Sequence, residues 1–145
     1  MRIWFKDYRL EDLIARSSGN MLQHTQIEFI ELGHNFIRAT MPVDHRTTTP
    51  VGLFHGGASC VLAESIGTCA SYLCIDPEIH SAVGIEINAN HLRSVTSGYV
   101  VGVVTPVHLG RSLHVWDIRI HDHTRPDQLV CISRLTTKIL DKRNA

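Results

Sequence analysis

The sequence predicts an α+β fold in which an antiparallel sheet wraps around one long helix. Segment 55–74 has helical length and carries apolar or small residues on nearly every side, which is typical of a buried helix. The segments before and after it contain short runs typical of strands, separated by turn-forming residues. Because short turns join antiparallel neighbours, we expect these strands to form one sheet around the helix.

Each element is expected at a definite place along the chain. A short amphipathic helix over 10–16 ends at the polar segment 17–20. Strands over 27–32 and 36–43 form a hairpin, and a loop over 45–52 leads into the helix. Four further strands are expected at 81–89, 99–107, 114–121 and 129–140, with turns at Gly98, Gly110 and Arg125-Pro126-Asp127. No linker or change of composition divides the chain, so we expect a single domain over residues 1–145.

Composition excludes several classes of protein. The chain has 145 residues, of which 43% are hydrophobic and 19% charged, as in globular domains. Lysine plus arginine equals aspartate plus glutamate, 14 against 14, so no broad attraction to nucleic acid or to an anionic membrane is expected.

The N-terminus and the cysteines indicate a cytoplasmic protein. The first residues, MRIWFKDYRLEDL, lack the apolar segment of a signal peptide, and no stretch is long and apolar enough to span a bilayer. Cys60, Cys69, Cys74 and Cys131 form no C-x-x-C pair and are expected to be reduced.

Glu64 lies in the middle of the predicted buried helix. Its neighbours at helical spacing are Cys60, Val61, Gly67 and Thr68, none of which is a cation. An unpaired carboxylate in such a place costs roughly several kcal/mol of desolvation, so folding alone does not favour it. Glu64 is therefore either the partner of an Arg or Lys from a strand, or a catalytic carboxylate.

The start of the helix favours the catalytic interpretation. His55-Gly56-Gly57 stands there, and the first N–H groups of a helix have no acceptor within the helix. Glycine lets a substrate oxygen approach these donors, which together with the helix dipole stabilise developing negative charge.

The spacing between Gly56 and Glu64 constrains the arrangement of the site. Eight residues of helix separate them, which is about 12 Å. One carbonyl group cannot readily contact both residues of the same helix. If both are catalytic, each site must combine Gly56 of one subunit with Glu64 of another across a two-fold axis.

The segment T-P-V-G-L-F-H-G-G-A-S-x-x-L-A-E-S-I-G, from Thr49 to Gly67, resembles the signature of bacterial hotdog-fold acyl-CoA thioesterases. The likeness is strongest to the dihydroxynaphthoyl-CoA hydrolases of menaquinone synthesis and the proofreading thioesterases of enterobactin synthesis. Further matching blocks cover most of the chain: Met41 to Asp44, Gly84 to His91, His108 to Arg111, and Arg134 to Thr137. The resemblance implies hydrolysis of an acyl-CoA without a cofactor, in a homodimer that usually assembles into a homotetramer.

The resemblance also implies roles for individual residues. Glu64 is the nucleophile or general base, and Gly56 N–H polarises the thioester carbonyl. His55 supports the carbonyl-side hydrogen bonds, and Thr68 holds water or the carboxylate. The residues that match CoA and substrate contacts are Gly84, His91, Leu92, Arg93 and Ser94, together with the loop His108, Leu109, Gly110, Arg111, Ser112 and Leu113. Arginine near the CoA phosphates is also electrostatically sensible.

One position departs from the family pattern. Relatives carry a glutamine before the proline that corresponds to Pro50, and this chain has Thr49. The threonine hydroxyl has a shorter reach than a glutamine amide, so the helper role of Thr49 at the carbonyl is open.

Three alternatives remain beside this interpretation. His121-Asp122-His123 could place two imidazoles on one strand face, but a zinc site needs a further ligand, and a solvated turn is the simpler interpretation. A hotdog dehydratase would use His55 and Glu64 for proton transfer on a hydroxyacyl thioester. A non-catalytic acyl-CoA-binding module would gain nothing from an uncompensated Glu64. The sequence leaves open the acyl group, aromatic or medium-chain, and the choice between nucleophilic and general-base chemistry.

Overall fold

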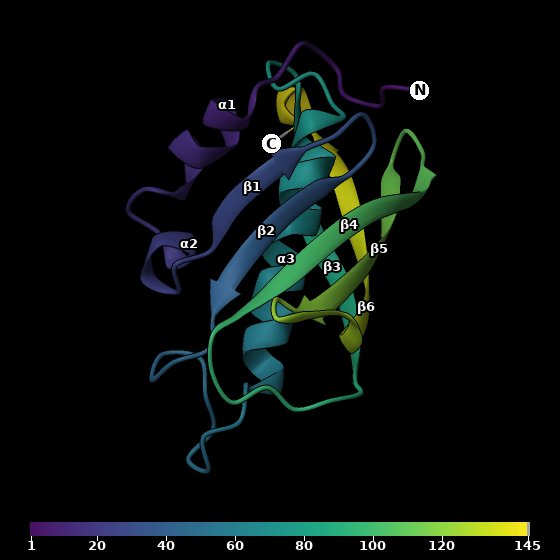
Figure 1. Cartoon of the computed structure of the whole chain (residues 1–145). Coiled ribbons are helices and arrows are strands. Elements are labelled where there is room, and N and C mark those ends of the chain that lie inside the picture. The colour runs from purple at the N-terminus through teal and green to yellow at the C-terminus, as the bar shows by residue number, and fades with distance from the viewer. Residues whose placement is uncertain (145) are drawn as a thin grey trace.

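The computed structural model describes residues 1–144 (Figure 1), so residue 145 of the expected domain lies outside the described residues. Helices precede the first strand: α1 (Leu10–Ile14), a 3-10 turn η1 (Ala15–Ser17) and α2 (Met21–His24). The central helix is α3 (Gly56–Leu73). The strands are β1 (Glu28–Leu32), β2 (Ile37–Pro42), β3 (His80–His91), β4 (Tyr99–Leu109), β5 (Leu113–Asp122) and β6 (Arg125–Asp141), followed by η2 (Lys142–Asn144).

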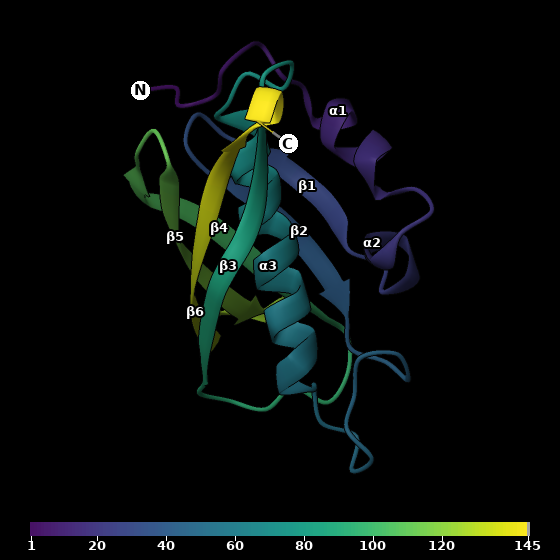
Figure 2. The same ribbon diagram turned by 180° about the vertical axis from the view of Figure 1, so that it is seen from behind.

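The six strands form one sheet in the order β1-β2-β4-β5-β6-β3, and every neighbouring pair is antiparallel. The sheet curves around α3, while α1 and α2 lie beside β1 (Figures 1 and 2). The predicted α+β hotdog architecture, one long helix wrapped by an antiparallel sheet, is therefore confirmed.

Alternation along the strands explains how the sheet holds the helix. On β5, Trp116, Ile118 and Ile120 point inward and are fully buried, while the residues between them are more exposed. On β4, Gly102 leaves room for α3: a Cβ there would lie 3.0 Å from Ile66 Cδ1. Helix and sheet thus pack closely on this side, with Leu62 and Ile66 fully buried.

The opposite side of α3 is less covered than the sequence predicted. The expectation was burial around most of the helix, yet a stripe at helical spacing is only half-buried. This stripe consists of Cys60, Val61, Glu64, Ser65, Thr68, Cys69 and Tyr72. Figure 2 shows the N-terminal half of α3 lying in front of the sheet on this side. Small and apolar residues there face outward because the sheet of one chain covers one side of the helix.

The predicted turn at Arg125-Pro126-Asp127 is wrong. Strand β6 already begins at Arg125, which pairs with Asp122, and the hairpin turn is His123-Thr124. The carboxylate of Asp122 shapes this turn by accepting hydrogen bonds from the Thr124 N–H (2.9 Å) and hydroxyl (2.8 Å). Proline is tolerated near the first residue of a strand because its missing N–H need not join the ladder.

Strand β3 forms one outer edge of the sheet and pairs only with β6 among the described residues. It is 12 residues long and exposes Val83 (40%) and Ile85 (54%). A long edge strand with exposed aliphatic side chains is a surface on which another strand can pair.

Candidate active site

Glu64 is the centre of the candidate site. It lies midway along α3 on the half-buried stripe, and its Oε1 accepts a hydrogen bond from Thr68 Oγ1 at 3.3 Å. No Lys, Arg or His of residues 1–144 forms an ion pair with it, so the structural partner considered from the sequence is not found within the described chain. Burial raises the pKa of Glu64, and the hydrogen bond from Thr68 partly offsets this rise.

Gly84 on β3 is the residue packed against this carboxylate. A Cβ at position 84 would lie 1.9 Å from Glu64 Oε1, a distance that no real side chain allows. Sequence matching placed Gly84 among the substrate contacts, and its structural position adds a reason for glycine there. Any side chain at Gly84 would displace the carboxylate from its place beside Thr68.

The N-terminus of α3 carries one free donor. His55 is the N-cap, and its Nδ1 accepts the hydrogen bond of Gly57 N–H at 2.8 Å. The carbonyl of His55 accepts from Ala58 (2.9 Å) and Ser59 (3.2 Å). Within residues 1–144, the Gly56 N–H is the donor of this first turn that finds no acceptor. It is therefore available to an oxygen of a bound molecule.

His91, at the end of β3, lies beside that donor. A Cβ on Gly56 would come 2.8 Å from His91 Nε2, so the imidazole ring packs directly on the glycine. His55, Gly56 and His91 thus form one group at the N-terminus of α3. Glu64, Thr68 and Gly84 form a second group further along the same helix.

A cavity of about 480 Å³ adjoins Glu64. Its walls come from α3, β3, β1, η1 and α2, and they are mostly apolar. The lining residues are Arg16, Leu22, Phe29, Glu64, Ser65, Thr68, Cys69, Tyr72, Ala82, Val83 and Gly84. An apolar cavity with a carboxylate at its wall is suited to an acyl group whose reacting carbon lies at Glu64.

Thr49 lies in the loop before α3 and uses its hydroxyl within that loop. Its Oγ1 accepts a hydrogen bond from Leu53 N–H at 3.2 Å, and its backbone N–H donates to Leu53 O at 2.7 Å. Among the described residues it contacts neither Glu64 nor the Gly56 N–H through a hydrogen bond. The helper role of Thr49 at the carbonyl remains a prediction.

The segment after His91 is anchored to β6. The backbone N–H groups of Leu92 and Arg93 both donate to Val130 O, at 2.8 and 3.3 Å, and Arg93 Nη1 donates to Leu129 O at 3.3 Å. Leu92, Arg93 and Ser94 are exposed near the N-terminus of α3. They are available to a ligand on the same side as His91.

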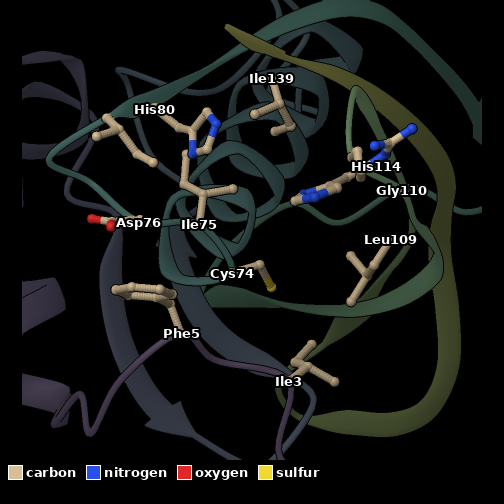
Figure 3. Close-up of a pocket in the computed structure, with 12 residues that line it drawn as sticks. Ile3, Phe5, Cys74, Ile75, Asp76, His80, Leu109, Gly110, His114 and Ile139 are labelled. Atoms are coloured by element: carbon tan, nitrogen blue, oxygen red, sulfur yellow. The ribbon is translucent and has the colours of Figure 1, made fainter. Parts of the chain in front are cut away.

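The predicted loop His108 to Leu113 is a tighter structure than expected. His108 and Leu109 belong to β4 and Leu113 to β5, so only Gly110, Arg111 and Ser112 form the turn. Leu109, Gly110 and Arg111 line a second cavity of about 610 Å³ beside Cys74, the C-cap of α3. Figure 3 shows Leu109, Gly110 and His114 on one wall of this cavity, and Phe5, Ile75 and His80 around the rest.

The two groups of predicted CoA contacts, 91–94 and 108–113, lie at opposite ends of the sheet within one subunit. Leu113 pairs with Lys138 and His91 with Cys131, both on β6. The step from Cys131 to Lys138 spans about 23 Å along a strand. Within one chain, the structure brings Gly84 to Glu64 and His91 to Gly56, and it separates these CoA groups.

The histidines of the β5–β6 hairpin belong to no group of three potential metal ligands among the described residues. Asp122 is buried rather than solvated, and its carboxylate is occupied by Thr124 and by Arg125 at 3.5 Å. Among residues 1–144, no three His, Cys, Asp or Glu side chains gather in a way that could hold a metal ion. In the same described range, no helix is long and apolar enough to cross a membrane.

Sequence reasoning missed the walls of the cavity beside Glu64. Arg16, Leu22, Phe29 and Tyr72 come from four elements, and nothing in their spacing distinguishes them from core residues. A weak sequence signal was given by Tyr72, which follows Glu64 by eight residues and so lies about two turns further along the helix, about 80° around its axis.

Fold and site together define a class of protein. A helix wrapped by a six-stranded antiparallel sheet carries an unpaired carboxylate beside an apolar cavity and a free N–H at its N-terminus. This combination is that of a hotdog-fold thioesterase.

Comparisons with known proteins identify the family. Residues 51–128 match the model of the thioesterase superfamily. A 1,4-dihydroxy-2-naphthoyl-CoA hydrolase of Escherichia coli is 52% identical over 138 residues, which are 95% of this chain and 99% of that protein. The proofreading thioesterase EntH of Cronobacter turicensis is 45% identical over 95% of this chain and 98% of its own.

A solved structure of a thioesterase also matches this chain over nearly its whole length. A mutant thioesterase from Pseudomonas aeruginosa has a TM-score of 0.92 and 45% identity, covering 96% of this chain and 99% of that chain. The chain belongs to the thioesterase superfamily and is an enzyme of the thioester hydrolase class. The resemblance recognised in the sequence is thereby confirmed.

Proposed function

We propose that this protein is a cytoplasmic acyl-CoA thioesterase whose active sites form between two subunits, with Glu64 as the catalytic carboxylate. The observation that carries the proposal is Glu64 itself, which is half-buried, has a raised pKa and has no cationic partner in residues 1–144. Such a carboxylate lowers stability, so its presence is explained by chemistry. A cytoplasmic location is part of the proposal, and the four free cysteines support it, because free thiols are typical of a reducing compartment.

The reaction needs a carbonyl-polarising donor and a carboxylate near one carbon atom. The free N–H of Gly56, at the positive end of the α3 dipole, supplies the donor, and His55 supports it. Glu64 either attacks the thioester carbon, giving an anhydride that water hydrolyses, or takes a proton from the attacking water. Either route consumes one water and releases one carboxylic acid and one CoA thiol. Thr68 holds the carboxylate or this water.

Subunit pairing brings the separated residues together. Because β3 is an open edge, two copies can pair β3 against β3 in antiparallel fashion, which places their α3 helices side by side and antiparallel. Glu64 then faces Gly56 of the partner subunit. The half-buried stripe of α3, including Val61 and Cys69, is covered in the same arrangement.

The same pairing unites the two groups of CoA contacts. The end of β3 at His91 in one subunit lies near the beginning of β3 in the other, where Leu109, Gly110 and Arg111 line the second cavity. One CoA would thus contact His91, Leu92, Arg93 and Ser94 of one subunit and the turn with Arg111 of the partner. Two such dimers would form the expected homotetramer.

The acyl group that we propose is aromatic or of medium length, and 1,4-dihydroxy-2-naphthoyl-CoA is the first candidate. The support is the Escherichia coli relative of that name, together with an apolar cavity that contains the rings of Phe29 and Tyr72. In this case the enzyme would serve menaquinone synthesis. A panel of acyl-CoAs compared by kcat/KM tests this choice.

Substitution of Glu64 tests the proposed reaction directly. Glu64→Gln is expected to lower thiol release by about 10²- to 10⁴-fold, because the amide can act neither as base nor as nucleophile. Glu28→Gln, at an exposed position of β1 that does not line the cavity beside Glu64, serves as the matched control and is expected to retain turnover. Near-wild-type turnover of Glu64→Gln would contradict the role, and enoyl product without thiol would indicate a dehydratase instead.

A further inference from the structure

The cavity beside Glu64 contains a cation that the proposed chemistry does not use. Among the residues of the described chain that line it, Arg16 is the one cationic side chain, and its neighbours include Leu22, Phe29 and Val83. Arg16 belongs to the short turn η1 and is exposed at the rim of the cavity. A cation at the edge of an apolar cavity can bind a polar group of a ligand whose apolar part fills that cavity.

Arg16 is positioned by an aromatic ring. Its guanidinium carbon lies 5.8 Å from the centroid of the Tyr72 ring, which is within the range of a cation–π contact. Within residues 1–144 the guanidinium makes no ion pair and donates no hydrogen bond. A contact with a ring face leaves the N–H groups at the edge of the guanidinium free to donate.

The position of Tyr72 sets the distance from the reacting carbon. Tyr72 follows Glu64 by eight residues on the same helix, about 12 Å toward its C-terminus. Glu64 and the Arg16–Tyr72 pair, all of which line the cavity, are therefore separated along the direction of the helix axis. An acyl group that reacts at Glu64 directs its far end toward the guanidinium.

We propose that Arg16, held over Tyr72, determines acyl specificity by binding an oxygen at the end of an aromatic acyl group farthest from the thioester. A phenolic or carboxylate oxygen there accepts charge-assisted hydrogen bonds from the guanidinium, whereas an unsubstituted ring offers no acceptor and leaves these donors to water. Phe29 and Tyr72 supply apolar surface for the ring. This inference rests on the proposed function, because it takes Glu64 as the reacting end.

The test compares 4-hydroxybenzoyl-CoA with benzoyl-CoA, which differ only in an oxygen opposite the thioester. Wild-type enzyme is expected to prefer the hydroxylated substrate in kcat/KM, and Arg16→Met is expected to reduce this ratio by about tenfold. Arg38→Met is the matched control: Arg38 also lies over a ring, that of Phe36 at 5.3 Å, but lines no part of this cavity. It is expected to leave the ratio unchanged.

Variants of Tyr72 test how the guanidinium is held. Tyr72→Phe keeps the ring and is expected to keep the preference, whereas Tyr72→Leu releases Arg16 and is expected to lower it. A preference that persists in folded Arg16→Met would overturn the inference, as would its absence in the wild type.

Binding measurements separate this inference from the proposed function. Phenacyl-CoA and 4-hydroxyphenacyl-CoA are ketone analogues that cannot be hydrolysed, so calorimetry with them reports recognition alone. Tighter binding of the hydroxylated analogue, lost in Arg16→Met, supports the inference even if the wild type releases no thiol from any acyl-CoA. Equal binding of the two analogues by the wild type would contradict it, whatever the rate of hydrolysis.

Discussion

Glu64 lowers the stability of the fold that contains it. Its pKa is raised by burial, so the native state binds its proton more tightly than the unfolded chain does. Stability therefore falls as pH rises from the ordinary glutamate pKa of 4.5 through the higher pKa of the folded state. A carboxylate in a structural ion pair would show the opposite dependence.

Glu64→Gln is thus expected to unfold at a higher temperature than the wild type at neutral pH. The difference should disappear as pH falls below about 4.5, where both side chains are neutral. Thermal unfolding of the two proteins across this pH range is the measurement. A lower unfolding temperature for Glu64→Gln at neutral pH would indicate a structural ion pair and contradict the interpretation of Glu64 as an unpaired carboxylate.

Gly84 permits the position of that carboxylate. Gly84→Ala places a methyl group on Glu64 Oε1 and is expected to lower kcat by about 10²-fold, since a displacement of about 1 Å has this effect in other sites. Gly102→Ala is the control, because its Cβ would meet the flexible end of Ile66 at 3.0 Å. That variant is expected to lose some stability and to keep its kcat. Full activity of Gly84→Ala would show that Glu64 has room to move.

At the scale of the element, helix α3 performs two tasks with one N-terminus. His55 accepts from Gly57 N–H and so caps the helix, while the Gly56 N–H is left free. The cap is needed because the following residues, two glycines, are poor at starting a helix. A single side chain thereby stabilises the element and leaves the Gly56 N–H as the donor without an acceptor among residues 1–144.

Two substitutions separate these tasks. His55→Ala is expected to lower the free energy of unfolding by about 1 kcal/mol, and His55→Asn to restore it, because asparagine is a strong N-cap. Both should reduce kcat/KM if the imidazole also supports the carbonyl. Denaturant unfolding and thiol release are measured on the same samples. If His55→Asn recovers both the free energy of unfolding and kcat/KM, the role of His55 is limited to capping the helix.

Sequence patterns predicted where the helices and strands lie along the chain better than they predicted how these elements are arranged in space. Segment 55–74 was expected to be helical, and α3 covers 56–73. The expected strands also appear, although β3 extends to His91 and β6 begins four residues before the predicted 129. Local propensity and capping residues determine these features. The turn at 125–127 was misplaced because a proline tolerated at the start of β6 resembles a turn signal.

The sheet order explains what could not be predicted. Strand β3 leaves the helix and pairs with β6, the last strand, so its neighbour is separated from it by two intervening strands in the chain. Long-range register of this kind leaves no local trace in the sequence. For the same reason the separation of His91 from Leu113, and the contact of Gly84 with Glu64, became visible only in three dimensions.

At the scale of the whole molecule, the proposed site requires two subunits. Gly56→Pro removes the N–H donor at the first helical position, where proline is favoured and the extended His55 backbone is compatible with it. Glu64→Gln removes the carboxylate. Each variant alone is expected to be inactive, since every site then lacks one component.

Mixed dimers are expected to recover activity. Random exchange gives half heterodimers, each with one complete site, so about a quarter of wild-type activity should return if sites are shared between subunits. Subunit exchange is verified by native mass spectrometry of differently tagged chains. Exchange without recovery would show that Gly56 and Glu64 do not serve the same site.

The hydrogen bond from Gly57 N–H to His55 also determines the tautomer of that imidazole. Since Nδ1 accepts a proton donor at 2.8 Å, the neutral ring carries its hydrogen on Nε2. His55 consequently presents an N–H, with no lone pair left to abstract a proton from a substrate carbon. A dehydration that begins with His55 as base would first have to break the helix cap, whereas donation to a thioester oxygen uses the ring as it stands.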